Sequence, residues 1–339
     1  NLDQINRQTV SNLALAWHQE VTPGNNMPTP LVRDGVMFLY SAGDVVLALD
    51  ATNGELLWRY SHDGDATTSH KFGIALYENK VLVPTSDLHM VALDARTGDV
   101  IWDHTINVDD SVGHALRSAP TIAGGQVIQG MAASFVPGGG FIIAIDLESG
   151  RETWRFNTLA KPDEPGGNTW NNIPLEERRG GSVWNTGSYD AELDLLFYGV
   201  SPTYNTGPLL YPLGIDGVNN DALYTNATLA LRPATGELVW YYQHVANDQH
   251  DLDWGFERSI VELEIEGEIK KVVITAGKPG LFDALDAATG AYLFSVDPGL
   301  QNLFSAINPV TGEKIANPNV FPDAEEVRTV CPYYQGGRN

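Results

Sequence analysis

One short pattern recurs along the chain and limits what the chain can fold into. Each copy reads Ala, an aliphatic residue, usually Asp, two variable residues, Thr, Ser or Asn, Gly, three further residues and an aromatic residue. Alternating apolar residues before the Asp favour a strand, the Asp-x-x-Thr-Gly core favours a tight turn, and the following residues favour a returning strand. The clear copies span residues 48–58, 92–102, 144–154, 230–240 and 284–294, and a degenerate copy covers 307–315.

This repeat predicts an all-β fold, a β-propeller of four-stranded antiparallel blades. The recurring unit is about 40 to 50 residues, the size of one such blade. The 34 Gly and 19 Pro residues among 339 agree with an architecture dense in turns. We therefore expect a single propeller domain over residues 1–339 with about five to six blades. Because this number is small for a large closed ring, either the ring is small or the chain is part of a longer one.

Local patterns predict individual elements. Alternation predicts a strand at residues 13–20, two strands within 31–47, and a hairpin within 187–199. Two insertions rich in Pro, Gly and Asn, at 161–177 and 201–220, interrupt the repeat. Such insertions are as consistent with a binding surface as with surface decoration.

Composition excludes some classes of protein. The formal charge of −23, from 43 acidic and 20 basic residues, disfavours binding to nucleic acid and favours solubility. Cys331 is the single cysteine, so an intrachain disulfide is impossible. No run approaches the roughly 18 apolar residues of a membrane-spanning helix. The chain starts at Asn1 rather than Met, which suggests a processed or trimmed N-terminus.

The recurring Trp of the pattern is interpreted as structural. Once per blade it can stack on the turn of a neighbouring blade, bury roughly 200 Å² and donate its indole N–H to a carbonyl. The Gly of the turn accepts a positive φ, and the Thr or Asp can bond the turn's own backbone. Trp184 lies outside these copies, so this structural explanation does not apply to it.

The pattern Ala-x-Asp-x-x-Thr-Gly-x-x-x-Trp resembles the tryptophan-docking repeat of the pyrroloquinoline quinone (PQQ) dehydrogenases. These are bacterial eight-bladed propellers that include methanol and other alcohol dehydrogenases. The likeness runs over essentially the whole chain, beginning at residues 4–6 and 12–17. It implies that the chain covers the N-terminal two thirds of such a propeller and lacks its C-terminal blades.

The same resemblance implies a periplasmic enzyme that oxidises a small-molecule alcohol by hydride transfer to the quinone. Electrons would pass to an external acceptor such as a cytochrome c, and the oligomeric state is left open. Non-enzymatic assembly propellers share the repeat, so the alternative is a propeller without cofactor that serves as a binding or assembly scaffold.

Two segments resemble the cofactor site of the family. Residues 180–184 read Gly-Gly-Ser-Val-Trp and are similar to the family's Gly-Gly-Thr-x-Trp, whose Trp lies under the quinone plane. The resemblance makes Trp184 the floor of the cofactor site, with an ordinary core Trp as the alternative, and Ser182 a contact to a cofactor carboxylate. Lys278 resembles the basic residue that hydrogen-bonds the quinone oxygens, where a cation would stabilise the reduced cofactor.

An acidic segment is similar to the family's catalytic loop. Residues 247–253 read Asn-Asp-Gln-His-Asp-Leu-Asp, which makes Asp251 the carboxylate that accepts the alcohol proton. Asp253 lies where lanthanide-using members carry an extra acidic ligand. On extended backbone, residues two apart face the same side, so Asp251 and Asp253 could meet one cation. The alternative is a solvated acidic loop. His244 and His250 are expected to be loop residues rather than metal ligands.

The chain also departs from the family pattern. Where a metal-binding Glu is expected, residues 130–135 contain no acid. Pro202 stands in the register of a metal-binding Asn, and Asn205 is displaced from it. The family's adjacent-cysteine disulfide would fall near Thr67 and Thr68, and Lys71 would at best substitute for a neighbouring Arg. Of the ligands for a calcium or lanthanide ion, the sequence therefore locates only Asp251 and Asp253.

Overall fold

The computed structural model describes residues 3–64, 72–109, 112–320, 322, 326–333 and 336. Its strands form five four-stranded sheets and one two-stranded hairpin. The strands are β1 (Leu31–Arg33), β2 (Val36–Ser41), β3 (Val45–Asp50), β4 (Leu56–Ser61), β5 (Ala75–Tyr77), β6 (Lys80–Pro84), β7 (His89–Asp94), β8 (Val100–Thr105), β9 (Thr121–Ala123), β10 (Gln126–Met131), β11 (Phe141–Asp146), β12 (Glu152–Asn157), β13 (Ser188–Asp190), β14 (Leu195–Gly199), β15 (Ala227–Leu231), β16 (Leu238–Gln243), β17 (Ser259–Ile265), β18 (Glu268–Ala276), β19 (Phe282–Asp286), β20 (Tyr292–Val296), β21 (Phe304–Ile307) and β22 (Lys314–Ala316).

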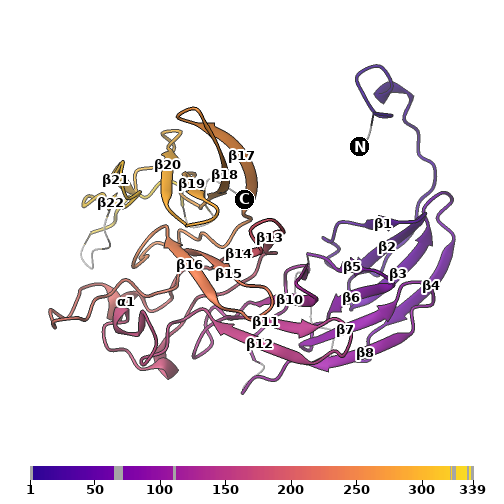
Figure 1. Ribbon diagram of the computed structural model, residues 1–339, viewed down its shortest axis with the longest axis horizontal. Helices are drawn as coiled ribbons and strands as arrows, with labels where there is room; N and C mark the ends of the chain where they lie inside the picture. Colours follow the sequence, from indigo (N-terminus) through magenta and orange to yellow (C-terminus); the bar gives the residue numbers. More distant parts are fainter. Residues whose placement is uncertain are drawn as a thin grey trace.

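The sheets follow one another around an arc, from the indigo N-terminal sheet to the yellow C-terminal hairpin (Figure 1). Each four-stranded sheet is an antiparallel meander in which strands adjacent in sequence pair. The predicted all-β propeller fold is therefore confirmed. The helical elements are short: α1 (Thr206–Leu209), η1 (Val10–Asn12), η2 (Gly167–Thr169) and η3 (Leu175–Glu177). Within the described residues, none of the helices is long and apolar enough to cross a membrane.

The core lies between successive sheets because the middle strands of each blade are apolar on both faces. Strands β6 and β14 are buried along their whole length, whereas the outer strand β4 has mostly exposed residues. One cluster joins the second and third blades, and it includes Leu82, Met90, Val127, Ile143 and Ile145. Burial of this apolar surface stabilises the contact of each blade with the next.

The predicted docking of Trp on neighbouring turns is confirmed. Each indole Nε1 donates to a carbonyl of the next turn at 2.8–3.2 Å. The turn Gly beneath each ring has a positive φ, and an added Cβ would lie within 2.8 Å of the indole. The pairs are Trp17 with Gly54, Trp58 with Gly98, Trp102 with Gly150, Trp154 with Gly236 and Trp240 with Gly290.

Two strand predictions were wrong. Residues 13–20, all within the described part of the chain, are not paired into a strand, although Trp17 still docks. Leu13 and Leu15 are exposed there. Residues 31–47 hold parts of three strands rather than two, because Asp34 and Gly35 adopt positive φ values and reverse the chain. The predicted hairpin in 187–199 is confirmed as β13 and β14.

The two insertions contact each other, because the Asn171 side-chain amide donates to the carbonyls of Pro208 and Tyr211 at 2.9 and 2.8 Å. Arg178, 1% exposed, donates to the carbonyls of Ile173, Ala160 and Gly167. Its guanidinium also lies 5.2 Å from the ring centroid of buried Trp170. Burial lowers the pKa of Arg178 to about 10. These contacts fix the first insertion directly before the segment that carries Trp184.

Candidate functional site

The segment before Trp184 is held by close backbone contacts. Gly180 and Gly181 have positive φ values. A Cβ on Gly180 would lie 2.3 Å from the carbonyl oxygen of Pro202, and one on Gly181 would lie 2.5 Å from a methyl group of Leu159. Only Gly fits both positions. The paired glycines thus allow the segment to lie against its neighbours and fix the position of Trp184.

Trp184 lines a cavity of about 610 Å³. The edge of Phe256 meets its ring at 5.2 Å and an interplanar angle of 85°, and Phe72 lies 6.2 Å away. The cavity is lined by residues from several blades: Phe72, Val112, Gly113, Ala115, Arg117, Ala132, Ser134, Phe135, Val136, Pro137, Ser182, Trp184, Ser201, Tyr204 and Asp253. Trp184 therefore stands at a cavity and not inside the apolar core.

Ser182 also lines this cavity and is 1% exposed. Its Oγ accepts the N–H of Ala133 at 2.9 Å and lies 2.9 Å from the Oγ of Ser134. These contacts fix the hydroxyl at the cavity wall. A ligand carboxylate there would meet two adjacent serine hydroxyls.

The acidic loop is organised by Asp248. Its buried carboxylate accepts the Asn226 amide at 2.8 Å and the backbone N–H groups of His250 and Leu252 at 2.8 and 2.6 Å. Burial raises the pKa of Asp248 to about 6, although these donors favour its ionised form. The carboxylate holds the loop that carries Asp251.

Asp251 lies between a cation and a phenol. Its Oδ2 is 2.9 Å from the Nζ of Lys278, and its Oδ1 accepts from the Tyr204 hydroxyl at 3.3 Å. Burial, followed by the charges of Asp251 and Asp253, raises the pKa of Tyr204 well above its usual value. Tyr204 thus stays protonated and acts as a hydrogen-bond donor.

Asp253 approaches the same ammonium from the cavity side. Its Oδ2 lies 3.9 Å from the Nζ of Lys278, while its Oδ1 accepts from the Ser201 hydroxyl at 3.1 Å and the Gly255 N–H at 2.8 Å. Burial raises the pKa of Asp253, which the charge of Lys278 partly offsets. The prediction of extended backbone at Asp251 and Asp253 was wrong, because both residues have a positive φ. Both carboxylates nevertheless approach one cation, the Lys278 ammonium.

Lys278 is positioned by the turn that precedes β19. Its backbone N–H is shared between the carbonyls of Leu252 and Asp253, at 2.9 and 3.1 Å. Gly277, one residue earlier, packs so closely on Trp254 that a Cβ there would lie 2.4 Å from the indole. The turn and the acidic loop therefore form one unit. Of the predicted site residues, Lys278 lies within 4 Å of both Asp251 and Asp253, and Ser182 and Trp184 line the adjoining cavity with Asp253.

Sequence reasoning did not single out Tyr204, Ser201 or Gly255. Tyr204 and Ser201 follow β14, in the segment where a metal-binding Asn was expected. That position in the sequence was the only indication that they lie near the site. Asn205 turns away: its Oδ1 accepts the Arg179 N–H, and its Nδ2 donates to the Glu177 carbonyl at 2.9 Å. Thr67, Thr68 and Lys71 lie outside the described residues.

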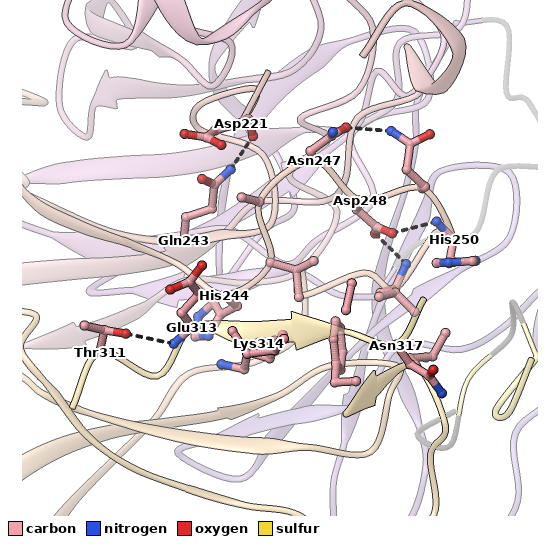
Figure 2. A pocket seen from close by; sticks show the side chains of 18 of the residues that line it. Asp221, Gln243, His244, Asn247, Asp248, His250, Thr311, Glu313, Lys314 and Asn317 are labelled. Atoms are coloured by element: carbon pink, nitrogen blue, oxygen red, sulfur yellow. Dashed lines mark hydrogen bonds between the residues drawn. The ribbon is translucent and has the colours of Figure 1, made fainter. Parts of the chain in front are cut away.

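A second cavity, of about 470 Å³, lies between the acidic loop and the β21–β22 hairpin (Figure 2). Asp248, His250, Glu313 and Lys314 are among its lining residues. Figure 2 shows the hydrogen bonds by which Asp248 holds the loop on this side. None of the five predicted site residues lines this cavity.

A buried network lines this cavity and reaches Trp254, directly after the acidic loop. His244 donates or accepts at both ring nitrogens, 2.6 Å from Asp283 and 2.7 Å from the Thr228 hydroxyl, and its ring stacks on Trp254 at 4.3 Å. The ammonium of Lys314 also bonds Asp283. Burial lowers the pKa of His244 to about 4, so the ring is neutral near pH 7. His244 is therefore a buried structural residue.

Comparison with known proteins identifies the family. Residues 1–327 match the family described as "Glucose/ethanol/alcohol dehydrogenase, beta-propeller domain", a PQQ family. The chain belongs to this family. It is 35% identical over 348 residues to the dehydrogenase subunit of an alcohol dehydrogenase (quinone) from Gluconacetobacter polyoxogenes, covering 94% of this chain and 46% of that protein. The chain thus spans about half the length of this relative.

Solved structures agree with this assignment. The quinohemoprotein alcohol dehydrogenase ADHIIG from Pseudomonas putida HK5 is 30% identical, with a TM-score of 0.87 over 98% of this chain and 51% of that one. A europium-containing methanol dehydrogenase is 25% identical, with a TM-score of 0.89 over 99% of this chain and 62% of that one. The blades described above therefore have the arrangement found in PQQ-dehydrogenase propellers.

Proposed function

We propose that the protein oxidises an alcohol or a related hydroxyl compound with PQQ, as its quinone-dependent relatives are named to do. We include in the proposal a single propeller domain over residues 1–339, a periplasmic location and an external electron acceptor such as a cytochrome c. The observation that carries the proposal is the position of Asp251, held between Lys278 and Tyr204 beside the cavity that Trp184 lines.

The cavity suits a flat anionic quinone. Trp184 and Phe72 offer aromatic surface, and Ser182 with Ser134 offers paired hydroxyls. The Arg117 guanidinium lines the same cavity and can pair with a cofactor carboxylate. PQQ, when bound, supplies the two-electron acceptor that takes a hydride from the alcohol carbon. This lining supports the assignment of Trp184 and Ser182 as cofactor contacts, and the Lys278 ammonium, 3.9 Å from the cavity-lining Asp253, is assigned as the third.

The chain's own groups handle the proton. Asp251 is the base that takes the hydroxyl proton of the alcohol onto a carboxylate oxygen. The Lys278 ammonium at 2.9 Å and the Tyr204 hydroxyl at 3.3 Å orient the carboxylate. Phe135 and Tyr204, with ring centroids 4.6 Å apart, place apolar surface beside Asp251. Such surface favours the carbon chain of an alcohol over a strongly charged substrate.

The alternative, a scaffold without cofactor, is disfavoured. A scaffold has no need of a carboxylate pair, an ammonium group and an aromatic-lined cavity in one place. It predicts that the protein neither binds PQQ nor reduces an artificial electron acceptor with alcohols.

The test is the Asp251→Asn variant. We expect it to bind PQQ as the wild type does and to lose at least about a thousandfold in kcat with a dye acceptor, because the base is removed. Asp194→Asn is the matched control, since Asp194 also has a positive φ and accepts from a tyrosine hydroxyl, Tyr189, at 3.0 Å. Unchanged turnover in Asp251→Asn would remove Asp251 from the mechanism.

A further inference from the structure

Within the described residues, no third acidic, His or Cys side chain joins Asp251 and Asp253 to complete a site for a hard cation. Calcium takes about six to eight oxygen ligands, and a site for it combines several carboxylate, carbonyl and amide oxygens. Among the residues that the structure describes, no group of three or more His, Cys, Asp or Glu side chains could hold a metal ion. The site therefore does not fit the cation that the europium-containing neighbour carries.

Other side chains occupy the places where further donors would stand. Residues 130–135 reach the cavity through Ala132, Ser134 and Phe135, and the Phe135 ring packs on Tyr204 instead of offering an oxygen. The acceptor oxygen of Asn205 is used by the N–H of Arg179. At these positions the chain offers the aromatic ring of Phe135 and an amide oxygen of Asn205 that is already hydrogen-bonded.

A positive charge nevertheless lies beside the two carboxylates of Asp251 and Asp253, and a side chain of the protein, Lys278, supplies it. The Lys278 Nζ lies 2.9 Å from Asp251 and 3.9 Å from Asp253. The Lys278 side chain is only 13% exposed, and its backbone N–H is fixed by the acidic loop itself. A metal ion bound by both carboxylates would have to lie beside this ammonium or displace it, and the like charges would repel at this range.

We propose that the Lys278 ammonium is the counter-charge of the Asp251–Asp253 pair and that the site binds its quinone without a divalent or trivalent metal ion. This inference rests on the proposed function. Lys278 then serves both carboxylates: its ammonium pairs with Asp251 at 2.9 Å and lies 3.9 Å from the buried carboxylate of Asp253. Alcohol oxidation in this chain therefore persists in a chelator.

Cation titrations without PQQ test the inference directly. Terbium(III) emission sensitised by tryptophan, together with calcium calorimetry, is expected to show no saturable binding tighter than about 1 mM in the wild type. Lys278→Ala leaves two carboxylates without their ammonium and should bind terbium at least about tenfold more tightly. Lys270→Ala, in β18, is the matched control and should behave as the wild type. Adding Asp253→Asn to Lys278→Ala should abolish the gain.

Two outcomes would overturn the inference. One is stoichiometric binding of terbium or calcium to the wild type below about 10 μM that Asp253→Asn abolishes. The other is an unchanged cation affinity in Lys278→Ala.

A second measurement compares the affinity for PQQ in EDTA with the affinity in calcium or lanthanum. We expect the two affinities to differ by less than about twofold, and a tenfold gain with metal would contradict the inference. Failure to bind PQQ in every condition would refute the proposed function and leave the titration result standing.

Discussion

The contact between Trp58 and Gly98 gives a quantitative test of how the blades are joined. Gly98 has φ +78°, and an alanine Cβ there would lie 2.7 Å from the Trp58 ring. The left-handed backbone costs an alanine about 1–2 kcal/mol. Displacing the ring also weakens the 3.0 Å bond from Trp58 Nε1 to the Ala95 carbonyl and loosens its packing, for about 2 kcal/mol more. Gly98→Ala should destabilise by about 3–4 kcal/mol.

Gly125→Ala isolates the backbone cost. Gly125 has φ +74° and no atom within 4 Å of an added Cβ, so its substitution should cost only about 1–2 kcal/mol. Urea unfolding followed by far-UV circular dichroism gives the free energy of unfolding of both variants, which can be compared when the dependence on urea concentration has the same slope. In a Trp58→Ala background, Gly98→Ala should fall to the cost of Gly125→Ala. Equal costs for the two glycines in the wild-type background would refute the docking argument.

Three further changes test other parts of the structure. An alanine at Gly255 would place its Cβ 2.8 Å from the Trp184 Nε1 and 2.9 Å from the Asp253 Oδ1, so PQQ affinity should fall about tenfold in calorimetry. The pKa of His244 is lowered to about 4, so its contribution to stability is complete above about pH 6.5 and is lost as the pH falls toward 4. The advantage of the wild type over His244→Gln in urea unfolding should therefore shrink by about 3 kcal/mol between pH 7 and pH 4. Arg178→Met leaves three buried carbonyls without their donor and should cost about 3 kcal/mol in the same assay.

Each of these expectations has its own control. Gly207→Ala, where an added Cβ meets no atom within 4 Å, should leave PQQ affinity unchanged, and an equal loss there would contradict the reasoning for Gly255. Comparing His244→Gln with the wild type at each pH cancels the titration of other groups, so a constant difference would refute the assignment to His244. Exposed Arg117→Met should leave stability unchanged, unlike Arg178→Met.

The fold could be predicted because its information is local and repeated. Each turn copy carries its own Gly after a Thr, Ser or Asn, usually with an Asp four residues before that Gly, and the Trp that docks on it recurs at the same spacing. The strand expected at residues 13–20 failed for the opposite reason. Alternating apolar and polar residues indicate that a segment is able to form a strand. Whether it does so depends on a neighbouring strand with free backbone groups, which the alternation does not specify. The turn at Asp34–Gly35 did carry a local signal, because Asp-Gly is a favoured two-residue hairpin turn, and it was missed because the whole run 31–47 was divided into only two strands.

The site could be predicted only in part. Trp184, Asp251 and Lys278 were located because short motifs around them resemble those of a family. Tyr204 and Ser201 reach Asp251 and Asp253 from about 50 residues away in the sequence, and nothing next to them marks that contact. The buried network of His244, Asp283 and Lys314 was missed for the same reason.

The most direct test of the central claim is the affinity of the protein for PQQ with and without the Trp184 ring. We expect one PQQ bound per chain in calorimetry, with Trp184→Ala weakening binding by about 30-fold, or ~2 kcal/mol, because the aromatic floor is lost. Trp184→Phe should keep most of the affinity. Equal affinity in the wild type and Trp184→Ala, or no binding to the wild type, would contradict the assignment of this cavity as the quinone site.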